Sequence, residues 1–306
     1  MKILLYAILF LTLVVSIFIL PKALRVHKIK TLYDKDKIVY NFANMDKIFP
    51  SRSIKASEEP KPIKRNIQTL PETFSFEGET KNLQEYLDYF WSDGMIVIHK
   101  DEIVYENYWL GNNESKKHIS WSVAKSFVSA LVGIAYEEGL IDSLNDPITK
   151  YLVDFENTGY EGVSIKDILQ MSTGVLFNED YADPNSDINR FGRAIATGTS
   201  MRDFSKTLTR EKTPGSFMHY VSINTQVLGF LLQEVTKKSI SEYLYEKIWN
   251  PLGMEDSAYF ILDDVGDELA LGGLNATLRD YAKFGLLYLQ KGNEFGERLA
   301  KIAKEA

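Results

Sequence analysis

The chain is organised around residues 118–139, which read His118-Ile-Ser-Trp-Ser122-Val-Ala-Lys125-Ser-Phe-Val-Ser-Ala-Leu-Val-Gly-Ile-Ala-Tyr-Glu-Glu-Gly139. After Ser122 the apolar residues recur at helical spacing, and Gly139 suits the position just past a helix end. We therefore expect a helix of about four turns. Because residues three apart lie on neighbouring turns of one face, the amine of Lys125 should lie beside the hydroxyl of Ser122.

A serine–lysine pair at the head of a helix is suited to nucleophilic catalysis. A serine hydroxyl needs a base to take its proton, and a lysine can help once burial lowers its pKa. Backbone N–H groups at the helix N-terminus favour the negative charge that develops during acyl transfer. Taken alone, however, Ser122 could be an N-cap and Lys125 a solvated first-turn residue.

Composition excludes several classes of protein. The 306 residues include 45% hydrophobic ones, enough for one large core or two smaller ones. The net charge of -7 and the lack of a basic stripe argue against nucleic acid as a partner. The absence of cysteine excludes disulfides and thiolate metal sites, and the four scattered histidines lack a His-Glu-x-x-His spacing. We expect no metal site.

The N-terminal residues 1–21 have the character of a membrane anchor or an export signal. An uninterrupted apolar run from Ile3 to Leu20 is just long enough to span a bilayer core. No small-residue cleavage site follows it, so we favour an uncleaved anchor. Basic residues after the run would favour a cytoplasmic body, but large domains often translocate regardless of flanking charge. We expect a membrane-anchored, extracytoplasmic protein, in the periplasm or on the cell surface.

Residues 22–71 and 72–306 differ in pattern. The first segment is polar and proline-containing and should form an extended stalk or wrap the domain. The second begins with a predicted helix at 83–91 and a hairpin of strands 95–99 and 103–108. A hairpin directly before the Ser122 helix favours an antiparallel sheet with helices on its face, hence an α+β fold. Further helices are predicted at 164–171, 224–236, 240–248 and 278–289.

A second polar cluster, Tyr220-Val-Ser222-Ile-Asn224-Thr225, precedes another apolar helix. A tyrosine whose pKa is lowered by a neighbouring lysine can act as general base or acid toward a serine. By itself, Tyr220 would more often be a half-buried aromatic residue.

Together these motifs resemble the β-lactamase-like serine hydrolase superfamily, which holds class C β-lactamases, D-alanyl-D-alanine peptidases, esterases and 6-aminohexanoate-dimer (nylon oligomer) hydrolases. The matches occur in the family's order, and the last of them contains Thr277, Asp280 and Lys283. The matching segments are Ser122-x-x-Lys125, Leu169-x-Met-Ser-Thr-Gly174, Tyr220-x-Ser222-x-Asn224-Thr225, Pro251-Leu-Gly-Met254 and Gly273-Leu-x-Ala-Thr277-x-x-Asp280-x-x-Lys283-Phe-Gly285.

The resemblance implies an antiparallel sheet flanked by helices, plus a mostly helical region. It makes Ser122 the acylated nucleophile, Lys125 its proton-transfer partner and Tyr220 the general base, acting on a small-molecule amide or ester without metal or cofactor. The backbone N–H of Ser122 and a donor from a strand near the carboxyl end would form the oxyanion hole.

The substrate-binding residues are also expectations from the resemblance. The Tyr-x-Ser form and Glu179-Asp-Tyr181-Ala-Asp-Pro184 are similar to the nylon-oligomer hydrolases. By that likeness Tyr181 would lie over the substrate and Asp187 could reach a substrate amine, although the loop could equally be a surface turn. Ser222 and Asn224 are the other expected substrate-binding residues.

One family feature is missing. Family members carry a Lys/His-Thr-Gly or glycine-rich motif on a strand well after the helix matching 278–289, and no such motif follows here. We therefore expect a domain that is incomplete at its C-terminus, with impaired activity or a wall supplied by a partner. The two functional readings are a serine hydrolase and a penicillin-binding or sensor-like protein that is acylated without turnover. The sequence leaves the oligomeric state open.

Overall fold

Helix α5 (Ala124–Glu137) is the helix predicted from the Ser122 stretch, and eight of its residues are buried, seven of them in the hydrophobic core. It follows a 3₁₀ turn at Trp121–Val123 and ends before Gly139, whose φ of +72° suits a residue without a Cβ. The computed structural model describes residues 6, 10, 12–14, 16–17 and 20–290.

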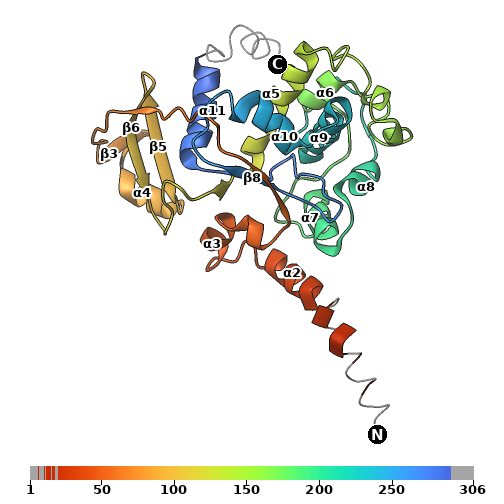
Figure 1. The fold of residues 1–306 in the computed structure, drawn as a ribbon, viewed down its shortest axis with the longest axis horizontal. Helices are drawn as coiled ribbons and strands as arrows, with labels where there is room; N and C mark the ends of the chain where they lie inside the picture. Colours follow the sequence, from red (N-terminus) through yellow and green to blue (C-terminus); the bar gives the residue numbers. More distant parts are fainter. Residues whose placement is uncertain (1–5, 7–9, 11, 15, 18–19, 291–306) are drawn as a thin grey trace.

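The described strands and helices come in runs along the chain, with no strand between α5 and β8 (Figure 1). The α-helices are α2 (Leu20–Lys30), α3 (Ile38–Phe42), α4 (Leu83–Tyr89), α5, α6 (Ile165–Leu169), α7 (Asp187–Thr197), α8 (Met201–Lys206), α9 (Ser222–Thr236), α10 (Ile240–Leu244) and α11 (Leu278–Leu289). The 3₁₀-helices are η2 (Met45–Lys47), η3 (Trp121–Val123), η4 (Ile148–Lys150) and η5 (Val153–Phe155), and η6 (Tyr245–Trp249) is a π-helix. The strands are β1 (Ser51–Ile54), β2 (Lys64–Arg65), β3 (Thr73–Phe76), β4 (Glu79–Asn82), β5 (Gly94–His99), β6 (Glu102–Tyr108), β7 (His118–Ile119), β8 (Ala258–Ile261) and β9 (Leu274–Ala276).

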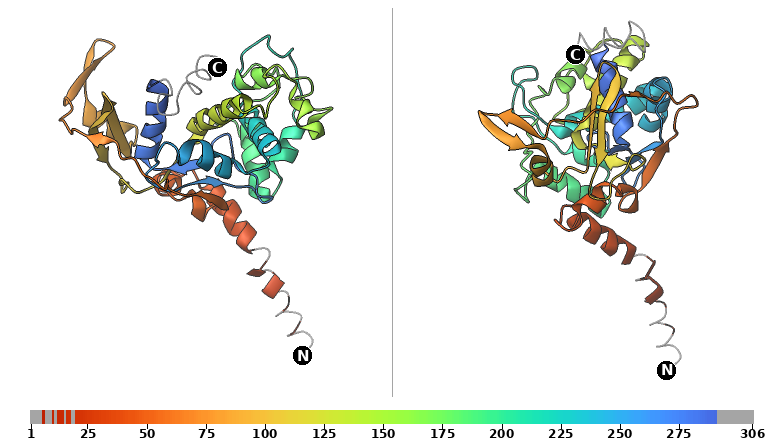
Figure 2. Two further views of the ribbon diagram at one scale, coloured as in Figure 1. Left: turned by 45° about the horizontal axis from the view of Figure 1, so that its top comes forward. Right: turned by 90° about the vertical axis from the view of Figure 1, so that its left-hand side faces the viewer.

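A four-stranded antiparallel sheet in the order β1-β8-β9-β7 lies behind the Ser122 region. Its register pairs Ser51 with Ile261, and His118 with Ala276. Figures 1 and 2 show α5, α9 and α10 on one side of β8, with α2 and α3 on the other. This arrangement agrees with the predicted α+β class of antiparallel sheet flanked by helices.

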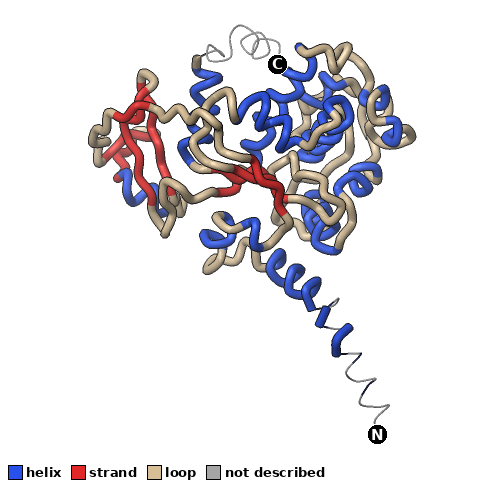
Figure 3. The backbone as a smooth tube through the Cα atoms, viewed as in Figure 1, coloured by secondary structure: helices blue, strands red, loops and turns tan. Residues whose placement is uncertain are grey.

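The predicted hairpin forms, but it belongs to a different sheet from the one expected. Strands β5 and β6 pair with each other across Lys100 and Asp101, whose φ values of 51° and 63° suit a tight hairpin turn. The short β2 pairs in parallel with β6, and α11 packs on β5. Figure 3 shows these strands as a group separate from the central ones. The central strands are only two to four residues long, too short for an alternating pattern to reveal them.

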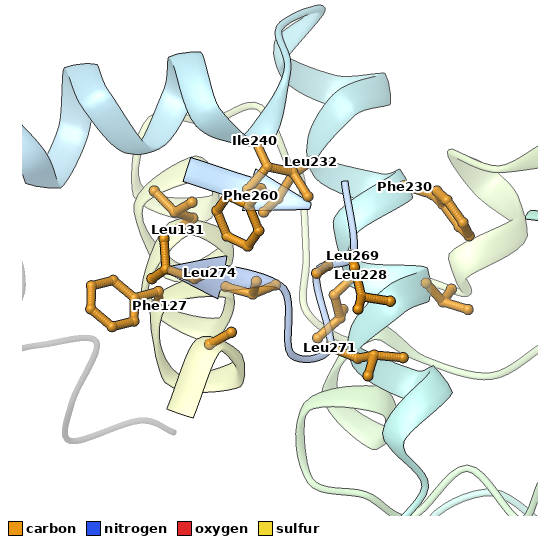
Figure 4. Close-up of a cluster of buried hydrophobic side chains, with 14 of the residues drawn as sticks. Phe127, Leu131, Leu228, Phe230, Leu232, Ile240, Phe260, Leu269, Leu271 and Leu274 are labelled. Carbon is orange, nitrogen blue, oxygen red and sulfur yellow. The ribbon is translucent and has the colours of Figure 1, made fainter. Parts of the chain in front are cut away.

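Side chains from distant segments meet between α5, α9 and the central sheet (Figure 4). Phe127 of α5 is almost fully buried and stacks on Phe284 of α11, with ring centroids 3.6 Å apart. Other members of the cluster come from α5, β8, β9, α9 and α10: Leu131, Phe260, Leu274, Leu232 and Ile240. The core therefore holds the helix that begins beside Ser122 against the sheet.

Residues 22–71 wrap the domain. Leu32, Met45 and Ile54 are buried in the same core, and β1 pairs with β8. The anchor predicted for residues 1–21 falls mostly outside the described residues and stays a prediction, as does the extracytoplasmic location. Within the part of the chain that the structure describes, no helix has the length and apolar character needed to cross a membrane.

The local helix predictions agree closely with α4, α6, α9, α10 and α11. Helix α11 covers the predicted residues 278–289, and the Thr277 hydroxyl caps it by accepting from the N–H of Asp280. Helices α7 and α8 were not predicted. Each is nevertheless capped by a serine, Ser186 and Ser200 respectively, and that signal was available in the sequence.

Candidate active site

Three predicted residues meet at one oxygen atom. The Lys125 Nζ atom donates to Ser122 Oγ at 3.2 Å, and the Tyr220 hydroxyl donates to the same oxygen at 3.0 Å. Lys125 lies one helical turn from Ser122, whereas Tyr220 is 98 residues away. Tertiary folding thus completes a cluster of which sequence spacing alone indicated two members.

Backbone geometry at Trp121 presents the Ser122 hydroxyl to solvent. Trp121 has a φ of +45°, which is rare for a bulky residue and persists only when the surroundings enforce it. Trp121 is the first residue of η3, which leads into α5, and Ser122 is exposed while Ala124 is fully buried. The serine therefore occupies the solvent-facing head of a helix whose next turn is embedded in the core.

Lys125 is held at the serine by a second contact. Its Nζ atom donates to the carbonyl oxygen of Leu271 at 2.6 Å. Burial lowers the pKa of Lys125, and this effect outweighs the opposing influence of Tyr220 and Glu179. A lower pKa increases the fraction of neutral amine, which is the form that can accept a proton.

Tyr220 lies at the end of a loop that precedes α9. The neighbouring His219 is fixed twice, because its N–H donates to the carbonyl of Met171 at 2.7 Å and its Nε2 lies 3.0 Å from the carbonyl oxygen of Phe177. The Tyr220 side chain remains 42% exposed. A fixed backbone with an accessible hydroxyl is the arrangement that proton transfer to a bound substrate requires.

Glu179 is a site residue that the sequence analysis did not single out. Its Oε2 accepts from the backbone N–H of Ser222 at 3.1 Å, and its Oε1 accepts from the hydroxyls of Ser222 and Tyr181. The carboxylate also raises the pKa of Lys125, although less than burial lowers it. Its position in the loop that contains Tyr181 was noted, but nothing local indicated a partner 43 residues later.

Tyr181 and Ser222 therefore belong to one hydrogen-bonded group, centred on Glu179, near Lys125. The Tyr181 residue is 61% exposed. Its pKa is raised, mainly because its phenol is partly buried and secondly because the negative charge of Glu179 is close to it. Ser222, in contrast, is fully buried, so it positions Glu179 instead of facing solvent.

The hydrogen bonds of Asn224 and Asp187 do not join either residue to Ser122, Lys125 or Tyr220. Asn224 is fully buried, and its Oδ1 accepts from the Tyr160 hydroxyl at 2.9 Å and from Thr173 at 3.3 Å. Asp187 accepts from the N–H of Asn178 and pairs with Arg190. Each of these polar groups thus has a partner inside the fold. The substrate-binding roles expected for both residues stay predictions.

The second oxyanion donor was expected from a strand after α11, which lies outside the described residues. Across residues 20–290 and the few described before them, no group of three or more histidine or acidic side chains is arranged to hold a metal ion.

The chain is similar in sequence to known proteins. The family model described as Beta-lactamase matches residues 82–305. The 6-aminohexanoate-dimer hydrolase of Paenarthrobacter ureafaciens is 27% identical over 265 residues, which cover 84% of this chain and 66% of that protein. The chain thus spans slightly less than two thirds of this curated relative.

Solved structures agree on the fold. The structure titled "Putative 6-aminohexanoate-dimer hydrolase from Bacillus anthracis" superposes with a TM-score of 0.82 at 26% identity, covering 90% of this chain and 75% of the other. The octameric penicillin-binding protein homologue from Pyrococcus abyssi gives a TM-score of 0.54 at 22% identity, covering 72% and 58%. The second similarity concerns the fold alone.

Proposed function

Because the chain belongs to the Beta-lactamase family, we propose that it is a serine hydrolase that cleaves an amide or ester bond through an acyl-enzyme on Ser122. One observation carries this proposal. Ser122 Oγ receives hydrogen bonds from both Lys125 Nζ and the Tyr220 hydroxyl, which are groups of the kind that remove a proton from a serine.

Acylation follows from this arrangement. Ser122 Oγ forms a bond to the carbonyl carbon of the substrate, and its proton passes to the Tyr220 and Lys125 pair. The tetrahedral intermediate then collapses, the carbon–nitrogen or carbon–oxygen bond breaks, and the departing amine or alcohol takes the proton. Water repeats the attack on the acyl-enzyme, which releases the carboxylic acid and returns a proton to Ser122.

The negative charge of the intermediate would develop beside the N-terminus of α5. The backbone N–H of Ser122 and the partial positive charge of the helix end favour an oxyanion at this place. Since such donors act only on charge that appears during the reaction, they lower the barrier more than they strengthen substrate binding.

The substrate class is a small linear amide or ester. A relative named for hydrolysis of the 6-aminohexanoate dimer supports this assignment, since that name describes a linear amide. In this chain, the exposed Tyr181 ring and the half-buried Glu179 carboxylate lie beside the Ser122 group and would contact the substrate. Contact with Tyr181 or Glu179 does not depend on a ring in the substrate.

Ester hydrolysis by the Ser122→Ala variant tests the proposal. With p-nitrophenyl acetate, the unaltered chain should give an acylation burst followed by steady turnover, and the variant should lose both. Ser126→Ala is the matched control, because Ser126 is an exposed serine one turn further along the same helix. Labelling by a fluorophosphonate probe should follow the same pattern.

Two results would contradict the proposal. Turnover by Ser122→Ala at the rate of Ser126→Ala would exclude Ser122 as the nucleophile. A burst of one equivalent without turnover in the unaltered chain would identify a protein that is acylated and not a hydrolase.

A further inference from the structure

The N-terminal segment, residues 20–49, contacts both sides of the candidate active site. At its first end, α2 packs against α7, and Arg25 forms an ion pair with Asp264. Helix α7 in turn holds the loop that carries Tyr181, because Asn189 Nδ2 donates to the carbonyl oxygens of Tyr181 and Asp183 at 3.1 and 2.8 Å. Figures 1 and 2 show α2 beside α7, outside the central sheet.

At its other end, the same segment lies against the residue before the nucleophile. The Tyr33 ring stacks on Trp121 with centroids 5.8 Å apart and planes inclined by 23°. Phe42 contacts both rings edge-on, at 5.8 Å from Tyr33 and 5.2 Å from Trp121. Two hydrogen bonds from the Asn41 amide, to the carbonyl oxygens of Thr31 and Leu32, fix the turn that carries Tyr33.

The Tyr33 phenol also influences Tyr181 electrostatically. Burial raises the pKa of Tyr33 to about 12, and the Tyr33 phenol is close enough to Tyr181 to contribute to the raised pKa of that residue. The Tyr33 side chain nevertheless remains 56% exposed. Its ring is therefore open to a ligand beside Trp121, the residue that precedes Ser122.

We propose that Tyr33 is a specificity-determining residue whose ring forms a wall of the substrate site and favours substrates with an apolar chain beside the scissile bond. This inference rests on the proposed hydrolase function. Tyr220 bonds to Ser122, and the Tyr33 ring stacks on Trp121, which directly precedes Ser122. Aromatic rings bind extended apolar chains by burying their surface. A short acyl or alkyl group would not reach the Tyr33 ring.

Chain-length selectivity of the Tyr33→Ala variant tests the inference in the full chain. One series compares p-nitrophenyl octanoate with p-nitrophenyl acetate, and the other compares hexyl acetate with ethyl acetate. Loss of the ring should lower the long-to-short ratio of kcat/KM by about three- to tenfold in at least one series, mainly through KM. Tyr33→Phe should keep the ratio, because it keeps the ring.

Tyr40→Ala is the matched control. Tyr40 belongs to the same segment and is 59% exposed, but its hydroxyl and ring contact Lys47 instead of the site. This variant should keep the selectivity of the unaltered chain. If Tyr33→Ala is insoluble, Tyr33→Leu removes the flat ring while keeping an apolar side chain and serves the same comparison.

Several outcomes separate the possibilities. Unchanged long-to-short ratios in both series would overturn the inference. An equal loss of kcat/KM on all four substrates would also overturn it, because a Tyr33 that only supported Trp121 would affect every substrate alike. A changed ratio in Tyr40→Ala equal to that in Tyr33→Ala would also overturn it. Failure of the proposed function is recognised independently, as undiminished turnover by Ser122→Ala.

Discussion

The Lys125 Nζ atom lies 2.6 Å from the carbonyl oxygen of Leu271, a residue 146 positions later. This contact directs the amine toward the head of α5, where it also reaches Ser122 Oγ at 3.2 Å. The carbonyl belongs to the turn before β9, and Gly273 in that turn has no room for a Cβ, which would lie 2.7 Å from Leu269. The central sheet therefore determines where the lysine points.

The rate of acylation should rise with pH as Lys125 loses its proton. Burial lowers the pKa of Lys125, so the midpoint should fall below about 10.4, the value for an unperturbed lysine. The acylation rate rises with pH, and does not fall, because only the neutral amine accepts the serine proton. Burst rates with p-nitrophenyl acetate, measured against pH and corrected for spontaneous hydrolysis, check this. A rate that falls across the same range would exclude Lys125 as a proton acceptor.

Tyr220→Phe should lower the acylation rate by about 100-fold or more while the protein keeps its fold. The substitution removes a group bonded to Ser122 Oγ at 3.0 Å and keeps the ring. Stopped-flow acylation rates and thermal melts measure the two effects. Tyr89→Phe is the control, since Tyr89 is 79% exposed on α4. Near-normal acylation in Tyr220→Phe would leave Lys125 as the base.

Glu179→Gln should shift the pH–rate profile for acylation toward lower pH. The Glu179 carboxylate raises the pKa of Lys125, so removing its charge should lower that pKa further. The shift is expected to be smaller than the effect of burial, which is the larger influence. Asp180→Asn is the control, because it neutralises the adjacent exposed carboxylate. Equal midpoints in the two variants would show that Glu179 acts only through its hydrogen bonds to Ser222.

Gly174→Ala should destabilise the protein and slow acylation together. Gly174 has a φ of +72°, and a Cβ there would lie 2.1 Å from the carbonyl oxygen of Lys212, in the segment that leads to Tyr220. We expect a loss of about 1–3 kcal/mol in the free energy of unfolding, measured in urea. Gly192→Ala, in α7, is the control.

The control has a definite expectation of its own. A Cβ at Gly192 meets nothing within 4 Å, and alanine favours helix by up to about 1 kcal/mol over glycine. Gly192→Ala should therefore be neutral or stabilising. If Gly174→Ala unfolds at the same urea concentration as Gly192→Ala, the segment at Lys212 moves freely and does not position Tyr220.

The sequence by itself determined features that depend on neighbours in the chain. Helical spacing and capping located α5 and α11, and the i,i+3 relationship brought Lys125 to Ser122. The hairpin of β5 and β6 was also evident, because its turn and both strands are contiguous. Tyr220 was identified through the resemblance of its motif to a known family, not through spacing.

Tertiary structure alone decided the rest. The four-stranded sheet joins β1, from a segment predicted to be a stalk or wrapping, with β8, and its short strands carry little periodic signal. The contact between Glu179 and Ser222 and the stacking of Tyr33 on Trp121 link residues 43 and more positions apart. Such contacts depend on packing of the whole core, which no local pattern encodes. The sequence thus specified the pairing of Ser122 with Lys125, and the fold specified the groups that surround them.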